Sequence, residues 1–517
     1  MLAQFVGKPF WIVLGSLAGV FALGILAFHS GFAPVALVLI SLGVFCLTLK
    51  RLEWGIAATF AELFANSHGH LLAMDLGGFR LSLRMAVFLA VMAAWAILIL
   101  FKKVKFSFGD ARWHPFIPLF FAIAVGFAGG IAGHDVRKAF QDGNAYFYLA
   151  YLFPVLSVSW NAVKQRMLLQ VLAASAAWVT LVTLGLLYVF THFPEWVLGP
   201  VYTFIRDTRT GELTKMPDTN LFRIFLQAQF SAIIFAFLLA PLLWLKAMVA
   251  RERAWTTAVL AGLAAVIFIS LSRSFWVGIA AGVFVFLAFL ALAVRPSLKR
   301  AGAGAALSVA AGIGGILLLV GIILFPLPNR FGSTGALSSL FSSRTTDATD
   351  VAVSSRWKLL PPMWELIAKK PILGQGFGQE VEFQTDDPRA RAFSPDGTWR
   401  TYALEWGWLE LWLKMGILGP IGFLLVFGSL ARGLIPYLKE ERAWLALGFM
   451  ASLTALYIIH TFSPYLNHPL GLGFLVFLLA FLKQKTPSQE DVPESEPTSG
   501  LAESVRIQPS VSPLMSE

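Results

Sequence analysis

The chain has 517 residues, of which 57% are hydrophobic and only 13% are charged, and its mean hydropathy is +0.72. A soluble protein of this size needs a far more polar surface, so the composition excludes that class and predicts an all-α, polytopic membrane protein. The formal net charge of +11 would suggest a nucleic-acid partner for a soluble protein. Here the lysines and arginines gather in alternate loops, as the positive-inside rule predicts, so no nucleic acid is implied.

Apolar runs near the length of a membrane-spanning helix recur along the chain. They cover residues 10–28, 33–49, 83–101, 116–131, 168–190, 222–244, 256–270, 275–294, 302–325, 406–427, 444–459 and 470–482. Two weaker segments, 54–64 and 145–159, bring the estimate from 12 to about 14 spans.

The alternation of charge predicts that both termini are cytoplasmic and that the first apolar run is a retained span. Four parts follow. We expect helices 1–11 in residues 1–325, a large outward loop in 326–403, the C-terminal spans in 404–485, and a disordered cytoplasmic tail in 486–517. The chain has a single cysteine, Cys46, so no intramolecular disulfide is expected.

The long outward loop is the most informative segment, because a loop of this length between apolar helices usually has a function. It carries nine basic residues, Arg330, Arg344, Arg356, Lys358, Lys369, Lys370, Arg389, Arg391 and Arg400. These predict an anionic partner at a membrane face. Asp386 and Asp387 come nearest to a metal site, but adjacent exposed acids are usually just solvated, so neither a metal nor a cofactor is expected.

Two arginines lie where outward segments meet apolar helices. Arg223 follows the predicted outer loop 191–220, in which Arg206 and Arg209 lie, and Arg273 is held in a short turn between two spans. Each is either a side chain that reaches the membrane interface or an anion ligand.

Within the long loop, Ser354 and Ser355 are natural N-caps for an amphipathic helix that would lie with its apolar face on the outer leaflet. That face would consist of Trp357, Leu360, Trp364 and Ile367. The Pro-x-x-Gly-x-Gly run that follows, residues 371–378, is either a plain turn or a close backbone approach to a ligand through Gly374 and Gly376.

The next apolar run begins with charged residues. We expect Glu405 to be buried near the interface and close to arginines, where a carboxylate could act as a general base. Glu410 and Lys414 are four residues apart with the acid first, which predicts an ion pair within one helix. His460 and His468 lie at the last outer turn, either as ordinary interface residues or as acceptor contacts.

These motifs, in this order, resemble the O-antigen ligase and polymerase superfamily, bacterial membrane glycosyltransferases of the helical GT-C type. The resemblance covers residues 10–482. It rests on Arg223 after an outer loop, on Ser270-Leu271-Ser272-Arg273, on Arg356-Trp357, and on the glycine run 371–378. The family commonly has a His-Asn pair about eleven residues before a Gly-x-x-Gly resembled by 416–419; here that position is Glu405.

The resemblance implies transfer of a glycan from a polyprenyl diphosphate to an acceptor hydroxyl, either on a lipid A core or on another lipid-linked glycan. The reaction would be metal-independent and inverting. Arg223, Arg273 and Arg356 would bind the diphosphate, Glu405 would take the role of the family's histidine, and Arg206, Arg209, Gly374, Gly376, His460 and His468 would contact glycan or acceptor. The protein would lie in the bacterial cytoplasmic membrane among membrane lipids. A ligase, a polymerase, a transporter or flippase, and a non-catalytic scaffold remain open.

Overall fold

The computed structural model describes residues 2–77, 79–216, 221–329, 331, 351–385, 391 and 394–483. Arg330, Arg344, Asp386, Asp387, Arg389 and the predicted tail 486–517 lie outside these ranges. The unit Met1–Lys483 contains all of the elements named below.

Eleven helices of this part of the chain, some with short 3-10 or π extensions, are long and apolar enough to cross a membrane. Their α-helical bounds are α1 (Lys8–Ser30), α2 (Ala33–Lys50), α4 (Leu83–Leu100), α5 (Ile117–Gly133), α8 (Ala162–His192), α10 (Phe230–Leu245), α11 (Ala250–Ile269), α12 (Arg273–Phe289), α13 (Leu298–Leu324), α18 (Leu418–Leu434) and α19 (Ala443–Phe462). The predicted all-α polytopic fold is confirmed.

The remaining three predicted spans form shorter helices. They are α3 (Leu52–Ala65), the 3-10 helix η3 (Asn144–Tyr151) with α7 (Leu152–Leu156), and α20 (Pro469–Leu479). The predicted run 406–427 is also divided, because Gly416 has φ 65° and separates α17 (Gly407–Met415) from α18. An apolar run predicts only that the segment is buried away from water, in lipid or in protein. In α20 the ten residues from Leu470 to Leu479 are buried by the surrounding protein.

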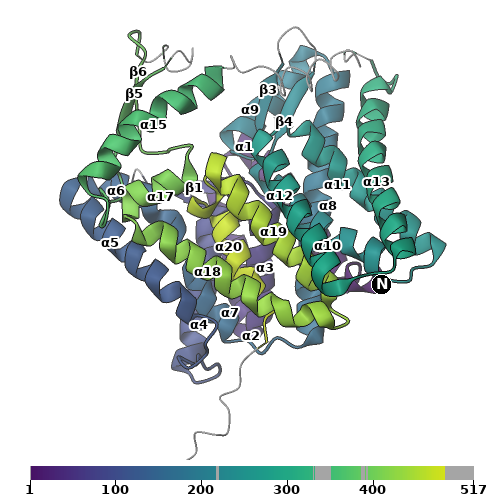
Figure 1. Cartoon of the computed structure of the whole chain (residues 1–517). Coiled ribbons are helices and arrows are strands. Elements are labelled where there is room, and N and C mark those ends of the chain that lie inside the picture. The colour runs from purple at the N-terminus through teal and green to yellow at the C-terminus, as the bar shows by residue number, and fades with distance from the viewer. Residues whose placement is uncertain are drawn as a thin grey trace, which may run out of the picture. The chain divides into compact units, whose positions relative to one another are not determined.

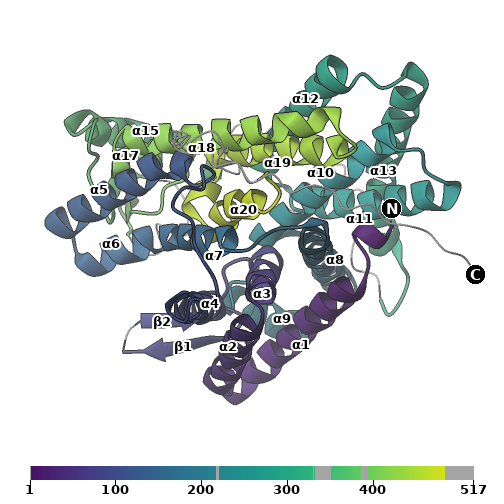
Figure 2. The same cartoon turned by 90° about the horizontal axis from the view of Figure 1, so that it is seen from below.

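The helices differ greatly in how much of their surface the protein covers. In the spans that contain α10 and α19, 78% of the residues in an apolar 18-residue stretch are buried inside the protein. The same share is 22% in α1 and 17% in α2. In Figure 1, α10 and α19 lie in the middle of the view between α18 and α13, and Figure 2 shows α1 to α4 grouped on one side of the bundle. The centre is therefore formed by α10 and α19, while α1 and α2 expose most of their surface.

Among the described residues, three short antiparallel hairpins interrupt the helices, and the apolar pattern did not predict them. They are β1 (Ala73–Leu76) with β2 (Phe79–Ser82), β3 (Glu212–Lys215) with β4 (Phe222–Phe225), and β5 (Val381–Gln384) with β6 (Thr398–Thr401). The predicted span 222–244 thus begins with a strand, in which Arg223 pairs with Thr214. Three other short helices matter for the site: α6 (Val136–Gly143), α9 (Glu195–Asp207) and the 3-10 helix η4 (Gln227–Gln229).

The helix predicted at the start of the glycine run is present as α15 (Val351–Lys369), with both internal prolines. Of the four residues of its predicted apolar face, only Ile367 is buried in protein. Leu359, Met363 and Ile367 are buried against Val381, Leu404 and Leu413, whereas Trp357 and Trp364 are 60% and 54% exposed. The indoles pack edge-to-face on Trp406 and Trp412 instead, since aromatic rings tolerate a half-exposed position.

A buried cluster of charge joins α17 to α6. Lys414 is 1% exposed and forms the predicted ion pair with Glu410. Its Nζ also donates to Asp142 Oδ1 over 2.5 Å and to the Tyr402 carbonyl over 2.8 Å. Because a buried ammonium is stable only with such partners, this lysine fixes three segments relative to one another.

Replacing this lysine should destabilise the fold strongly. Lys414→Met leaves the Glu410 and Asp142 carboxylates buried without a counter-charge, and we expect a loss of about 3–5 kcal/mol in the free energy of unfolding. The measurement is thermal and denaturant unfolding of purified protein in detergent. The control is Lys483→Met, because Lys483 also pairs with a glutamate but at the surface, where such a pair contributes little. Equal midpoints for the two variants would contradict the role given to Lys414.

Candidate functional site

Arg223 is bonded to the turn that carries the second predicted arginine. Its Nε donates to the Ser270 carbonyl over 2.8 Å, and its guanidinium lies 4.8 Å from the centre of the Phe225 ring. The Arg223 side chain extends from strand β4 and is half-buried. The β3–β4 hairpin is therefore joined to the segment that leads into α12.

Arg273 is the first residue of α12, and the turn before it is tightly organised. Leu271 has a left-handed backbone with φ 47°, and the hydroxyls of Ser272 and Ser274 lie 3.0 Å apart. The Ser463 hydroxyl donates to Ser274 over 3.0 Å, so the turn contacts the end of α19.

Arg356 and Glu405 form an ion pair through Nε and Oε2. The indole Nε1 of Trp406 donates to the Arg356 carbonyl over 2.8 Å, and the Trp406 ring lies 5.8 Å from that of Phe462. The Glu405 side chain is 52% exposed, so the expected burial of this carboxylate is wrong, whereas the expected arginine neighbour is present. α15 thus also reaches the end of α19.

The segment 462–465 is the common contact of these pieces. Besides Phe462 and Ser463, it contains Tyr465, whose hydroxyl donates to the Gln227 carbonyl just after β4 over 3.1 Å. β4, α12 and α15 are distant in sequence, yet each is connected to this one turn. The structure thus gathers the segments of Arg223, Arg273, Arg356 and Glu405 around the end of α19.

Four other residues that were predicted as contacts lie elsewhere. Arg206 and Arg209 are exposed at the end of α9, away from these hydrogen bonds. His460 is fully buried and its Nδ1 accepts the Leu466 N–H over 3.1 Å. A contact between His460 and an acceptor is therefore not supported, because its ring is enclosed by the fold. His468 Nδ1 accepts the Leu470 N–H over 3.2 Å and begins α20.

The glycine run 371–378, here called the strap, is bonded to protein along its length. Four successive N–H groups, from Gln375 to Gly378, donate to the Leu413 carbonyl, the Lys414 carbonyl, the Gly126 carbonyl and the Asp142 carboxylate, over 2.7, 3.1, 2.9 and 2.8 Å. His134 Nε2 donates to the Gln375 carbonyl over 2.9 Å. The strap is a structural connector between α5, α6 and α17, and not a free turn.

The strap glycines are required by this path. Gly374 and Gly376 have φ values of 74° and 91°, which side chains rarely adopt. Both are buried. A Cβ on Gly376 would collide with the backbone of Gly129 and Gly130. The predicted glycan contacts of Gly374 and Gly376 are thus not supported, because protein backbone occupies the space beside them.

A methyl group on the strap should therefore destabilise the protein. For Gly376→Ala we expect a loss of about 1–3 kcal/mol from backbone strain, with a further loss from the collision. Gly321→Ala in α13 is the control, since a Cβ there meets no atom within 4 Å and alanine favours a helix. Unfolding midpoints in detergent measure both; a Gly376→Ala variant as stable as the control would refute the structural role of the strap.

A second group of histidines lies after α3 and was not among the predicted site residues. His68 and His70 are half-buried, and the His68 ring lies 5.3 Å from that of His468. Burial, reinforced by Arg84 and Arg209, lowers the pKa of His68 from 6.5 to about 3; burial and the same arginines with Arg80 lower the pKa of His70 to about 4. The signal in the sequence was a Ser-His-Gly-His run close to basic residues.

These lowered pKa values predict a loss of stability in mild acid. In the unfolded chain both imidazoles take up protons below about pH 6.5, whereas in the folded protein they stay neutral to about pH 4. The unfolded state binds more protons in this window, so the free energy of unfolding falls as the pH decreases from about 6.5 to about 4. Melting temperatures against pH should fall less steeply for His68→Asn than for the unmodified protein. Parallel curves would show that His68 is not held neutral.

The fold and site define a polytopic helical membrane protein with arginine-bearing segments gathered at one end of its central helices. Residues 257–424 match the family model described as O-antigen ligase. The match, which includes Arg273, Arg356, Glu405 and the strap, confirms the predicted resemblance to the O-antigen ligase and polymerase superfamily. A comparison with curated proteins finds no match.

Proposed function

We propose that this protein is a membrane glycosyltransferase that moves a glycan from a polyprenyl diphosphate to an acceptor hydroxyl at the outer face of the bacterial cytoplasmic membrane. The observation that carries the proposal is the meeting of the Arg223, Arg273 and Arg356 segments at the end of α19, within a chain that matches the O-antigen ligase family. In this orientation both termini are cytoplasmic and the segment 326–403 is periplasmic.

The three arginines would bind the diphosphate of the donor. As the bond between the anomeric carbon and the diphosphate oxygen breaks, negative charge grows on the leaving diphosphate. One guanidinium group can donate two parallel hydrogen bonds to two phosphate oxygens and so stabilise that negative charge. The proposal therefore needs no metal ion. Arg223 and Arg273 come from segments joined by a hydrogen bond, and Arg356 is linked to the end of α19 through Trp406.

Glu405 would accept the proton. The acceptor hydroxyl oxygen attacks the anomeric carbon from the side opposite the diphosphate, its proton passes to the Glu405 carboxylate, and the new glycosidic bond has inverted configuration. The ion pair between Glu405 and Arg356 supports this assignment, because a base at Glu405 would then lie beside the diphosphate. The acceptor is a lipid A core in a ligase or another lipid-linked glycan in a polymerase; the chemistry at the donor is the same.

A transfer assay tests the proposal on purified protein, with a polyprenyl-diphosphate-linked oligosaccharide and a lipid A core acceptor. We expect Glu405→Gln to lower the rate by about 100-fold or more, because proton transfer is lost. The double variant Arg223→Ala with Arg273→Ala should lower it by about 100- to 1,000-fold. Arg295→Ala is the control, since Arg295 follows the other end of the same α12 segment and should keep full activity.

Each outcome has a clear reading. Transfer that survives in the double arginine variant would refute the clamp, and full activity of Glu405→Gln would assign the base elsewhere. Product on a second lipid-linked glycan instead of the lipid A core would identify a polymerase. No product from the unmodified protein with either acceptor would refute the enzyme and favour a transporter or scaffold.

A further inference from the structure

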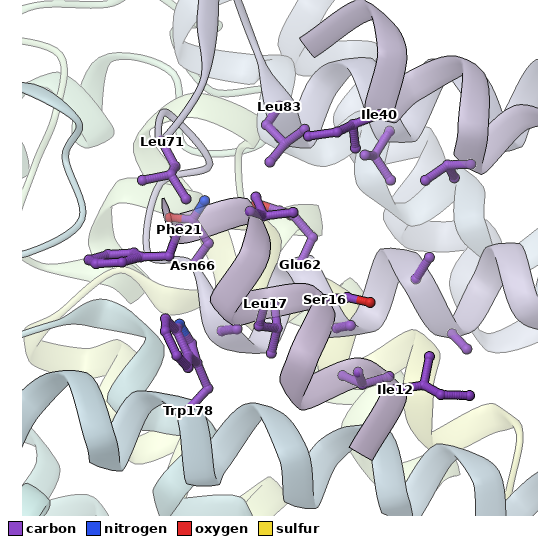
Figure 3. A pocket seen from close by; sticks show the side chains of 18 of the residues that line it. Ile12, Ser16, Leu17, Phe21, Ile40, Glu62, Asn66, Leu71, Leu83 and Trp178 are labelled. Atoms are coloured by element: carbon purple, nitrogen blue, oxygen red, sulfur yellow. The ribbon is translucent and has the colours of Figure 1, made fainter. Parts of the chain in front are cut away.

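Large apolar side chains gather in two places that the proposed reaction does not use. One is a cavity of about 360 Å³ between α1, α2, α3 and α8, whose lining Figure 3 shows. Its walls are helices of the bundle, so apolar side chains are expected there. The other is an exposed surface on α15 and the start of the strap, in the long segment between the spans α13 and α18. A loop surrounded by water needs a polar surface, so this second place indicates a partner.

Helix α15 has three faces, each recognisable from its burial and its residue types at about 100° per residue. One face is buried against the rest of the protein and consists of Leu359, Met363 and Ile367. A second, here called the apolar face, is exposed and consists of Trp357, Pro361, Trp364 and Ala368. The third, here called the charged face, is also exposed and consists of Lys358, Glu365 and Lys369. Figures 1 and 2 both show α15 beside α17 at the edge of the bundle.

The apolar face continues into the strap and from there to a span. Ile372 and Leu373 follow α15 closely and are 65% and 58% exposed. The Pro371 carbonyl accepts the N–H of Ile417 over 3.0 Å, and Ile417 immediately precedes α18. Ile421 on α18 is exposed and lies four residues further on, about 6 Å at the rise of an α-helix. The exposed apolar side chains of the loop therefore begin where the exposed apolar side chains of a span end.

The two indoles of the apolar face are held in place by the protein. Trp357 and Trp364 pack edge-to-face on Trp406 and Trp412, with ring centres 5.4 and 5.5 Å apart. These inner indoles donate through Nε1 to main-chain carbonyls of α15 and of the strap, each over 2.8 Å. Fixed, half-exposed tryptophans are typical of the boundary between hydrocarbon and head groups, because the ring is apolar and its N–H is polar.

The charged face carries more positive than negative charge. Lys358 and Lys369 belong to it and Lys370 follows directly, whereas Glu365 is its one acid. A lysine stem can lie along an apolar surface while its ammonium group reaches a phosphate. Basic residues beside an apolar helix face are attracted to anionic lipid head groups.

We propose that α15 and residues 371–373 form an anchor in the membrane interface, in the leaflet on the side of the long loop. The apolar face would lie against acyl chains and the charged face toward anionic head groups. A glycan could stack on the two indoles, but Ile372 and Leu373 offer it neither an aromatic ring nor a hydrogen bond. Hydrocarbon suits the whole surface, which is also continuous with the exposed side of α18.

The anchor does not depend on the proposed reaction, but it has a consequence for it. Arg356 is part of α15 and pairs with Glu405. A helix held in the interface would therefore fix the depth of this pair at the level of lipid head groups.

Spin-label depth measurements on the full chain test the anchor. The chain has one cysteine, so Cys46→Ser leaves no other thiol. In that background, Ala368→Cys places a nitroxide on the apolar face and Lys369→Cys places one on the charged face, one residue away. The protein is reconstituted in nanodiscs of phosphatidylcholine and phosphatidylglycerol. Relaxation by oxygen, which concentrates in hydrocarbon, is compared with relaxation by a nickel chelate, which stays in water.

We expect the oxygen-to-nickel ratio to be several-fold higher for Ala368→Cys than for Lys369→Cys, because an interfacial helix buries its apolar face about 5–10 Å deep. Both variants should melt at the temperature of Cys46→Ser, since both positions are exposed.

A matched pair of further variants tests the continuity with the strap. Adding Ile372→Ser and Leu373→Ser should lower the ratio for the label on Ala368→Cys at least about twofold, because the apolar surface that holds the helix is reduced. Leu298→Ser is the control, since Leu298 is 90% exposed but begins α13, a whole span away from the long loop.

The outcomes separate the anchor from its alternatives. Equal, water-like ratios at the two labelled positions would overturn it, and protection of the Ala368→Cys label by the oligosaccharide of the donor would then assign the apolar face to a glycan. A ratio unchanged by the two serine substitutions would also overturn it. The depth measurement requires no catalysis, so an anchor found in a protein without glycan transfer would support this inference and refute the proposed function.

Discussion

The buried ammonium of Lys414 is the interaction on which the geometry of the arginine-bearing end depends. Its Nζ bonds to α6 through Asp142, to its own helix through Glu410 and to the Tyr402 carbonyl, while its main-chain carbonyl accepts from the strap. A charge in this position is tolerated only if all of these partners stay in place. Glu405 lies in the chain between Tyr402 and α17, both of which are bonded to this lysine. Arg356 is part of α15, which leads directly into the strap. The Lys414 cluster therefore determines the positions of both Glu405 and Arg356.

The end of α19 has a complementary role. α19 is among the most buried helices of the bundle. The segment 462–465 at its end contacts Gln227 just before α10, Ser274 at the start of α12 and Trp406 just before α17. The hydroxyls inside this helix, those of Ser452, Thr454 and Tyr457, are bonded to main-chain carbonyls. The helix can therefore remain in the apolar interior while its end positions side chains from distant parts of the chain. The arginines therefore lie at the rim of the bundle, where charge is compatible with a membrane protein.

The sequence predicted what depends on local pattern and missed what depends on distant contacts. Hydropathy identified the long helices, and the four-residue spacing identified the Glu410–Lys414 pair. Asp142, which completes that pair, is 272 residues from Lys414 and has no local signal. The β3–β4 hairpin was missed because its second strand is apolar and reads as the start of a span. The packing of α15 on the rest of the protein through Leu359 and Met363 was not predicted, because their partners Val381, Leu404 and Leu413 are distant in sequence.

The glycine motif of the strap is explained by its contacts with the rest of the protein. The N–H groups of residues 375–378 bond to main-chain carbonyls of α5 and α17 and to one carboxylate of α6, and the strap glycines are needed where two backbones touch. Ile372 and Leu373 within it are exposed and bond nothing through their side chains. Such a segment restricts which residues can be accepted at the glycine positions and leaves its exposed positions free of this restriction. The Pro-x-x-Gly-x-Gly pattern is therefore required by the backbone path of the strap, and its constraint acts on the fold.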